Sequence, residues 1–112
     1  TMTPQQIKRA KRLAEILGLI THDVHTMDGI QLPITENGDE FNPEQDKALL
    51  WDLQVNYNIE LGKSEIRTGK HDYIQGYFAW DREESHKNFQ INESLSVALI
   101  DCVIEINGGY DG

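Results

Sequence analysis

The chain has little of what fixes a small protein covalently. Its 112 residues include one cysteine, Cys102, and three prolines. A single cysteine cannot form an internal disulfide, so the sequence does not require an oxidising compartment. Cys102 falls within an aliphatic stretch, and we expect it to be a small buried apolar side chain.

Long apolar runs are also missing. No stretch approaches the ~20 residues of a membrane-spanning helix, and no apolar signal-peptide segment follows the charged N-terminal residues. We therefore expect a cytoplasmic protein that has no membrane partner.

Positive charge is scarce and unevenly placed. Ten lysines and arginines stand against nineteen carboxylates, which gives a formal net charge of −9. Residues 1–20 carry four cations and one carboxylate, a balance of +3, whereas residues 21–112 carry six cations and eighteen carboxylates, a balance of −12. Nucleic acid is therefore not an expected general partner, because its phosphates repel an acidic protein.

The cations of the first segment share one face of a predicted helix and are Lys8, Arg9, Lys11 and Arg12. Three interpretations of this face stay open. It is a solvated helix face, it docks on the acidic surface of this chain or of a second subunit, or it binds an acidic partner or nucleic acid.

Three stretches have helical periodicity. The first, about 4–17, starts with the capping pattern Thr3-Pro4 and ends at Gly18. The second, about 43–56, starts in the same way at Asn42-Pro43. The third, about 93–107, is apolar on most of its circumference, which is typical of a buried helix.

The apolar residues of the third helix form two stripes. The broad stripe consists of Leu95, Leu99, Val103 and Ile106 and the narrow one of Val97, Ile100 and Ile104. We expect the broad stripe to face a β-hairpin and the narrow stripe to meet another helix or a second subunit. If the narrow stripe is exposed in a monomer, it marks an interface.

Alternating and aromatic residues predict an antiparallel hairpin at about 58–66 and 72–80, with Gly76 marking a bulge or a close contact with a helix. A candidate third strand lies at about 30–34, where Pro33 limits it to an edge. The aromatic residues Tyr57, Tyr73, Tyr77, Phe78 and Trp80 lack the basic groove of a nucleic-acid platform. We expect most of them in the core, and one or two at a protein interface.

These elements predict one α+β domain over residues 1–112, a small antiparallel sheet packed with three helices in an α/β/α sandwich-like arrangement. The domain has three parts, which are a basic amphipathic helix at 1–18, a loop-rich segment at 19–41 and a helix–hairpin–helix module at 41–106.

Residues that carry chemistry are loosely spaced. The four histidines are His22, His25, His71 and His86, and the acidic clusters are Asp39, Glu40, Glu44 and Asp46, and Asp81, Glu83 and Glu84. A metal site needs three or four converging ligands, and runs of carboxylates on loops are usually solvated. No nucleophile elbow or phosphate-binding glycine loop is present. We expect no catalytic, cofactor or metal site, and hence no enzyme.

The module at 41–106 enters with FNPEQDKALLWDLQVNYNIEL and leaves with NESLSVALIDCVIEI. It resembles the phage ABA sandwich domain family of small phage and prophage proteins. The resemblance implies a sheet layered between helices and a phage or prophage source, and therefore a location in the host cytoplasm. It supplies no active site to transfer.

Charge and resemblance together predict a phage or prophage accessory protein that binds a host or phage protein. More specifically, we expect its acidic surface to inhibit a host nucleic-acid-binding or defence protein. The candidate partner-binding residues are Lys8, Arg9, Lys11, Arg12, Asp81, Glu83 and Glu84. The alternative is a nucleic-acid-binding regulator that uses the basic helix. A homodimer stays open in either case.

Overall fold

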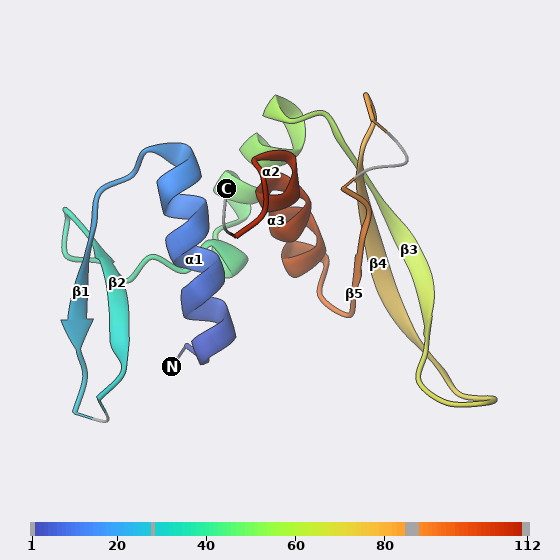
Figure 1. Cartoon of the computed structure of the whole chain (residues 1–112), viewed down its shortest axis with the longest axis horizontal. Coiled ribbons are helices and arrows are strands. Elements are labelled where there is room, and N and C mark those ends of the chain that lie inside the picture. The colour runs from blue at the N-terminus through green and yellow to red at the C-terminus, as the bar shows by residue number, and fades with distance from the viewer. Residues whose placement is uncertain (1, 28, 85–87, 111–112) are drawn as a thin grey trace.

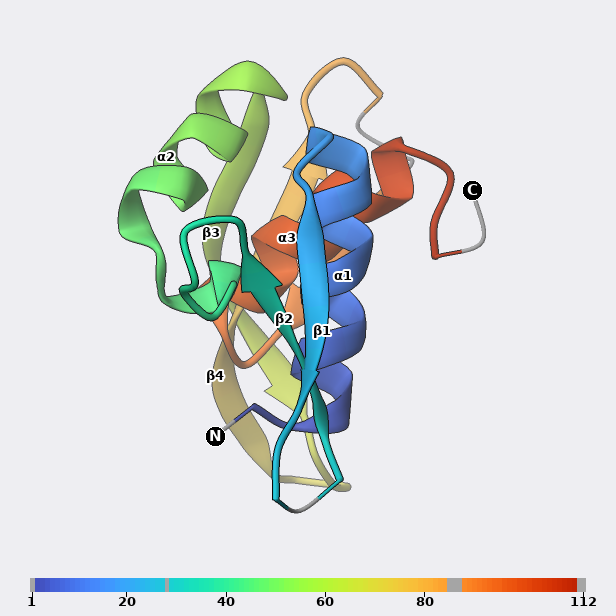
Figure 2. The ribbon, with the colours of Figure 1, turned by 90° about the vertical axis from the view of Figure 1, so that its left-hand side faces the viewer.

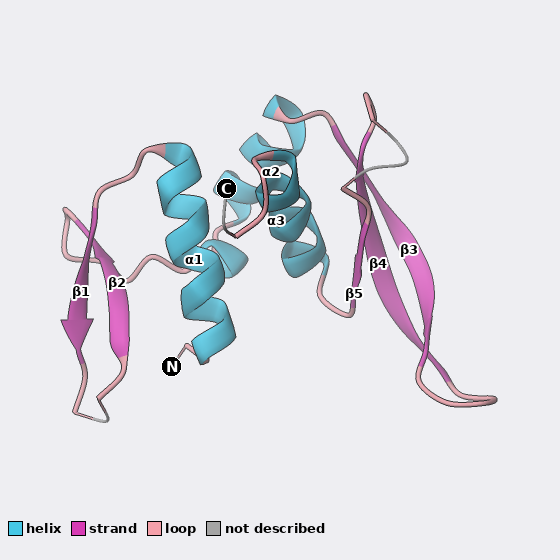
Figure 3. Cartoon of the chain, viewed as in Figure 1, coloured by secondary structure: helices cyan, strands magenta, loops and turns pink. Residues whose placement is uncertain are grey.

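The structure, a computed structural model, describes residues 2–27, 29–84 and 88–110. Three α-helices, a 3₁₀ helix and five strands follow one another in the described residues (Figures 1 and 3). They are α1 (Pro4–Leu17), β1 (Thr21–His25), β2 (Gln31–Thr35), η1 (Pro43–Gln45), α2 (Lys47–Asn56), β3 (Ile59–Arg67), β4 (Tyr73–Asp81), β5 (Gln90–Asn92) and α3 (Leu95–Ile106). The predicted α+β class is confirmed.

The strands form two antiparallel sheets, one of β1 and β2 and one in the order β3-β4-β5. The two sheets lie at opposite ends of the molecule with the helices between them (Figure 1). The layers therefore run sheet, helices, sheet, whereas the sequence predicted a single sheet between helices. The difference arises because the segment at 19–41 forms a sheet of its own.

α1 has the predicted bounds, and its ends show why. The Thr3 hydroxyl accepts a hydrogen bond from the Gln6 N–H, and the Gln6 side chain accepts one from the Thr3 N–H, which completes a capping box. Gly18 ends the helix in the left-handed conformation at φ 70°. Ala10, Leu13 and Ala14 are buried in the common core.

α2 starts later than predicted. The side chain of Asn42 makes no capping bond, and Pro43–Gln45 is a separate 3₁₀ turn. The α-helix begins after Asp46, whose carboxylate accepts a hydrogen bond from the Leu49 N–H at 3.1 Å. Asp46 has extended backbone angles, which break the helix that Pro43 would otherwise start.

α3 is the core of the protein. Ser94 caps it, and the side-chain oxygen of Asn92 accepts a hydrogen bond from the Ser94 N–H. The narrow stripe of Val97, Ile100 and Ile104 is buried, so it does not mark an exposed interface. On the broad stripe, Leu99 lines the same recess as Leu61 of β3 and Tyr77 of β4, as expected for a stripe that faces the hairpin.

The predicted hairpin forms within one residue of its expected bounds, and its register is continuous from the Ile59–Asp81 pair to the Arg67–Tyr73 pair. Its third strand is β5, not the segment at 30–34. That segment becomes β2 and pairs with β1, because the turn near Gly29 folds it back on residues 21–25. Pro33 lies in this small sheet, where its carbonyl accepts a hydrogen bond from the Phe41 N–H.

The helices cover one face of the three-stranded sheet (Figure 1). Ile59 and Ala79 belong to the core shared with α3, so alternation along the strands turns Phe78 and Trp80 to the opposite face. The sequence predicted most of the five aromatic residues in the core and one or two at an interface. Tyr73 is 55% exposed and the other four are partly buried, with Tyr57 packed against the core. Phe78 and Trp80 lie outside the core because the helices cover only one face of the sheet (Figure 1).

Two glycines let large side chains lie flat on the uncovered face. The ring of Phe78 lies against Gly62, and the side chain of Ile66 lies against Gly76. Gly76 is therefore neither a bulge nor a contact with a helix, since the ladder is unbroken there and Ile66 belongs to the neighbouring strand.

We predict that Gly62→Ala lowers the free energy of unfolding by about 1–3 kcal/mol, because the new Cβ overlaps the ring of Phe78 and forces it off the sheet. Thermal or urea denaturation measures the loss. Ser64→Ala, two residues along the same strand and on the same face, is the control. Equal stability of the two variants would contradict the close approach.

Candidate binding surfaces

Arg9 of α1 forms two ion pairs with distant parts of the chain. Its Nε donates to Asp101 Oδ1 of α3 and its Nη1 to Glu44 Oε2 of η1, both at 3.0 Å. Its side chain is only 12% exposed. Burial opposes the charge, but the two carboxylates prevail and raise the pKa of Arg9. Arg9 therefore joins α1 to both α3 and η1.

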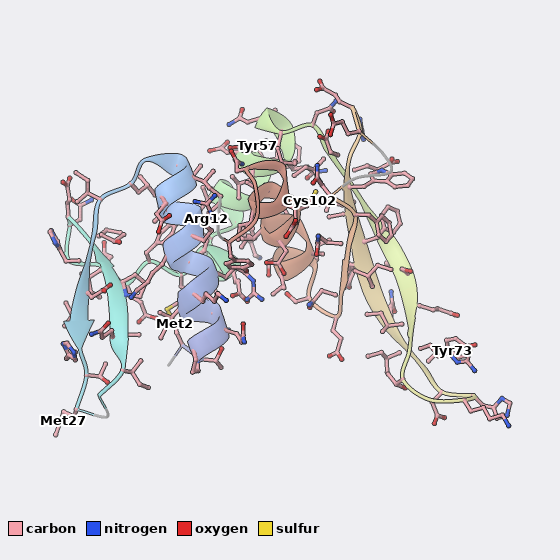
Figure 4. All side chains as sticks on the ribbon, in the orientation of Figure 1. Met2, Arg12, Met27, Tyr57, Tyr73 and Cys102 are labelled. Carbon is pink, nitrogen blue, oxygen red and sulfur yellow. The ribbon has the colours of Figure 1, made fainter. Side chains whose placement is uncertain are left out.

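Arg12, labelled in Figure 4, is 9% exposed and ties α1 to the end of α3. Its Nε donates to the Gly109 carbonyl at 2.8 Å and its Nη2 to the Asn107 carbonyl at 3.0 Å. The last carbonyls of a helix carry partial negative charge, so a guanidinium there satisfies and stabilises them. Nη1 of Arg12 also pairs with Glu15 at 3.2 Å.

The other two cations are also in contact with this chain. Lys11 pairs with Asp23 of β1 at 2.9 Å, and the Lys8 ammonium lies 4.9 Å from the ring centre of Tyr110. The Tyr110 hydroxyl donates to Asp101 at 2.9 Å. Burial, together with Asp101, raises the pKa of Tyr110 to about 12.

The four predicted partner-binding cations thus contact their own chain. This agrees with the interpretation in which the basic face of α1 docks on the acidic surface of the same chain. Four carboxylates are used in this way, which are Glu15, Asp23, Glu44 and Asp101. Of the seventeen carboxylates in the described residues, the other thirteen stand against five other cations. The negative charge of the protein therefore lies outside these contacts.

The predicted acidic residues at and just after the end of β4 have different roles. Asp81 is buried, and its Oδ1 accepts a hydrogen bond from the Glu83 N–H at 3.0 Å, which shapes the turn. Glu83 and Glu84 are exposed. Asp81 therefore belongs to the fold rather than to a free acidic surface.

The three histidines that the structure describes do not converge. His22 and His25 lie on β1 and are exposed, while His71 lies at the far end of the β3–β4 hairpin, and His86 is outside the described residues. Over the described ranges, no group of three or more His, Cys, Asp or Glu side chains is placed to hold a metal ion.

A second acidic cluster does form a concave surface, which we call the acidic groove. It is lined by residues 19–20, 35–37, 39–42 and 45–47 and has a volume of about 770 Å³. Figure 2 shows the connection after β2 looping beside the first turns of α2. The groove is thus built from three segments that are distant in the sequence.

A tight turn positions the carboxylates of the groove. The Gly38 N–H donates to the Thr35 carbonyl and the Thr35 N–H to the Asp39 carbonyl, with Gly38 at φ 87°. A bridge between Ile34 and Glu40 extends the turn from β2. Phe41 follows and is buried, which anchors the loop to the core. The Asn37-Gly38 turn that the sequence indicates therefore holds the acidic residues in place.

Charge and apolar surface meet in this groove. Its ionisable side chains are four carboxylates and one cation, namely Glu36, Asp39, Glu40, Asp46 and Lys47. Glu36, Asp39 and Glu40 are exposed and form no ion pair with any described residue. Beside them, Leu19 is 46% and Ile20 61% exposed.

Asn42 is one of the residues that line the groove, and it has an unused acceptor. Its side-chain oxygen is buried and has no hydrogen-bond partner among the described residues. A buried acceptor without a donor costs free energy, about 1–3 kcal/mol. A donor from a bound molecule would remove that cost.

Sequence reasoning noted the carboxylates of this groove but interpreted them as a solvated loop. It did not place Leu19 and Ile20 beside them, because that contact depends on how β1 and β2 fold against α1. The available signal was the pair of apolar residues directly after the stop signal of Gly18.

The comparisons with known proteins add no assignment. Protein-family models, curated proteins and solved structures contain no match to this chain. Within the described ranges, no helix has the length and apolar character needed to cross a bilayer.

We predict that Arg12→Met lowers the free energy of unfolding by about 2–3 kcal/mol, because it keeps the apolar stem but leaves the carbonyls of Asn107 and Gly109 without their charged donor. Urea denaturation measures the change. Lys8→Met on the exposed part of the same helix is the control, with a change within about 0.5 kcal/mol. Similar losses in both variants would argue against a specific role for Arg12.

Cys102 lies on the side of α3 that faces the three-stranded sheet and is fully buried, as predicted (Figure 4). Burial, with Asp81 and Glu105 adding to it, raises the pKa of its thiol from 9.0 to about 12. At pH 8 only about one thiol in 10⁴ is then ionised.

We therefore predict that iodoacetamide at pH 8 alkylates Cys102 in the native protein only as fast as the fold opens, and rapidly in denaturant. Mass spectrometry measures the rate. As control, Met27→Cys places a thiol at the exposed tip of the β1–β2 hairpin, where it reacts at once (Figure 4). Equal native rates at the two positions would contradict the burial of Cys102.

Proposed function

We propose that this chain is a non-enzymatic accessory protein that acts by binding another protein, and that the acidic groove is its binding site. The observation that carries the proposal is the imbalance of charge in the groove, four carboxylates against one lysine, beside exposed Leu19 and Ile20. A partner that fits carries a basic segment with one or two apolar side chains. The carboxylates attract it, and the apolar pair gives it a place to bury surface.

Two further features support a basic partner. The side chains of Glu36, Asp39 and Glu40 form no ion pair with the cations that the structure describes, so their charge faces solvent. The buried side-chain oxygen of Asn42 lacks a donor among the described residues, and lysine and arginine side chains are donors only.

The biological form of the proposal is a phage or prophage protein that inhibits a host nucleic-acid-binding or defence protein. A protein that binds nucleic acid presents a basic groove, and an acidic surface competes for it. The proposed phage source rests on the resemblance of residues 41–106 to the ABA sandwich family. A gene neighbourhood without phage or prophage genes would remove this part and leave the binding proposal intact.

The nucleic-acid-binding alternative required a free basic face on α1. Its four cations contact this chain, and no other observation on the described residues favours that alternative.

We predict that the triple variant Glu36→Gln, Asp39→Asn, Glu40→Gln weakens partner binding about tenfold, since pairs at the edge of an interface contribute about 0.2–1 kcal/mol each. Affinity capture from bacterial lysate at low salt identifies the partner, and calorimetry with the purified partner measures the change. Binding of the unmodified protein should weaken as salt is raised, because salt screens exposed charges.

The matched control neutralises three exposed carboxylates outside the groove, Asp52, Glu65 and Glu105, and gives the same net charge of −6, since −9 + 3 = −6. It should bind like the unmodified protein. If both triple variants lose affinity equally, total charge rather than the groove controls binding. If no basic partner is captured at low salt, the proposal fails.

A further inference from the structure

The face of the three-stranded sheet that the helices leave uncovered carries mainly apolar side chains. Alternation and register place Ile66, Ile74, Phe78, Trp80 and Ile91 on it. Ile91 is 45% exposed, and Phe89, directly before β5, is 44% exposed. Among the described residues, no helix or strand packs on this face (Figure 1).

The aromatic residues on this face form one cluster. Phe78 and Phe89 are stacked with ring centres 6.1 Å apart, and Trp80 meets both edge-on at 5.6 and 6.0 Å. The indole N–H of Trp80 donates to the carboxylate of Glu60 on the neighbouring strand. The cluster therefore has a fixed arrangement in the isolated chain, so little side-chain freedom is lost when a partner covers it.

Two glycines flatten the same face. Phe78 lies against Gly62 and Ile66 against Gly76, so neither side chain stands upright on the sheet. A flat apolar sheet face is the surface on which a second sheet packs, at a distance of about 10 Å.

The charge on this face decides which partner fits. Along the strands its only ionisable side chain is Glu60, which is bonded to Trp80, although the chain as a whole carries −9. Most of the remaining surface repels a second copy and attracts a basic partner. This face neither repels a second copy nor attracts a basic partner, so its charge does not favour the basic partner proposed for the acidic groove. Two copies of this face bring together only one carboxylate each, and that carboxylate keeps its hydrogen bond from the Trp80 indole.

We propose that the occupant of this face is a second copy of the chain, in a symmetric dimer whose two three-stranded sheets pack face to face. A two-fold interface is self-complementary, because each copy offers the same apolar patch to the other. The interface is centred on Phe78, Trp80, Phe89 and Ile91. It does not depend on the proposed acidic groove.

Sedimentation of the full chain from micromolar to millimolar concentration tests the proposal. The unmodified protein should sediment as a dimer with a measurable dissociation constant. Ile91→Lys places a charge in the interface and should weaken the dimer at least about 100-fold. Val24→Lys, on the other sheet at a position 48% exposed, is the matched control and should leave the dimer unchanged.

A second measurement avoids any question of whether the lysine variant folds. Trp51→Phe leaves Trp80 as the single tryptophan, since the chain has two, and Trp51 is 66% exposed on α2. Quenching of Trp80 by acrylamide should fall as the protein concentration rises. A protein that stays monomeric throughout, a dimer that Ile91→Lys leaves equally tight, or a Trp80 that quenches equally at all concentrations overturns the proposal.

Discussion

The arrangement of the whole molecule depends on two guanidinium groups that hold α1 against α3. Arg9 reaches Asp101 and Glu44, and Arg12 reaches the carbonyls that follow α3. Both side chains are largely withdrawn from water, where an ion pair is strong but an unpaired charge is costly. The contacts are therefore selective, since another placement of α1 leaves buried charges without partners. Through α1 they also place the β1–β2 sheet, and with it one wall of the acidic groove.

This pairing changes what the charge pattern of the sequence means. A basic helix on an acidic chain suggests a protein with one positively charged and one negatively charged surface. In the folded protein the cations of α1 face inward or toward neighbouring side chains, and thirteen of the seventeen described carboxylates are left outside their ion pairs. Two charges that form an intramolecular ion pair neutralise each other and are no longer available to bind another molecule. The fold thus turns a segregated charge pattern into a predominantly acidic exterior.

Local signals predicted most of the elements, and non-local contacts explain the errors. The bounds of α1 follow from Thr3, Pro4 and Gly18, because each affects the backbone only within a few residues of its own position. Asn42 and Asp46 both qualify as caps by type, but only the Asp46 side chain accepts a hydrogen bond at the start of a helix in the structure. Three features depend on tertiary contacts that sequence periodicity cannot predict. They are the pairing partner of the strand at 31–35, the exposure of the aromatic face and the assembly of the groove from separate segments.

The two proposed surfaces differ in a way that lets both operate at once. The acidic groove lies where the β1–β2 side meets the start of α2, and the apolar face lies on the far side of the three-stranded sheet (Figure 1). A dimer formed through the sheets leaves both grooves open. Two linked grooves bind a partner with repeated basic segments more tightly than one does, because the second contact forms at a high effective concentration. If both proposals hold, dimerisation strengthens binding without contributing a contact to the groove, and a monomeric variant keeps its intrinsic affinity but loses the gain from two sites.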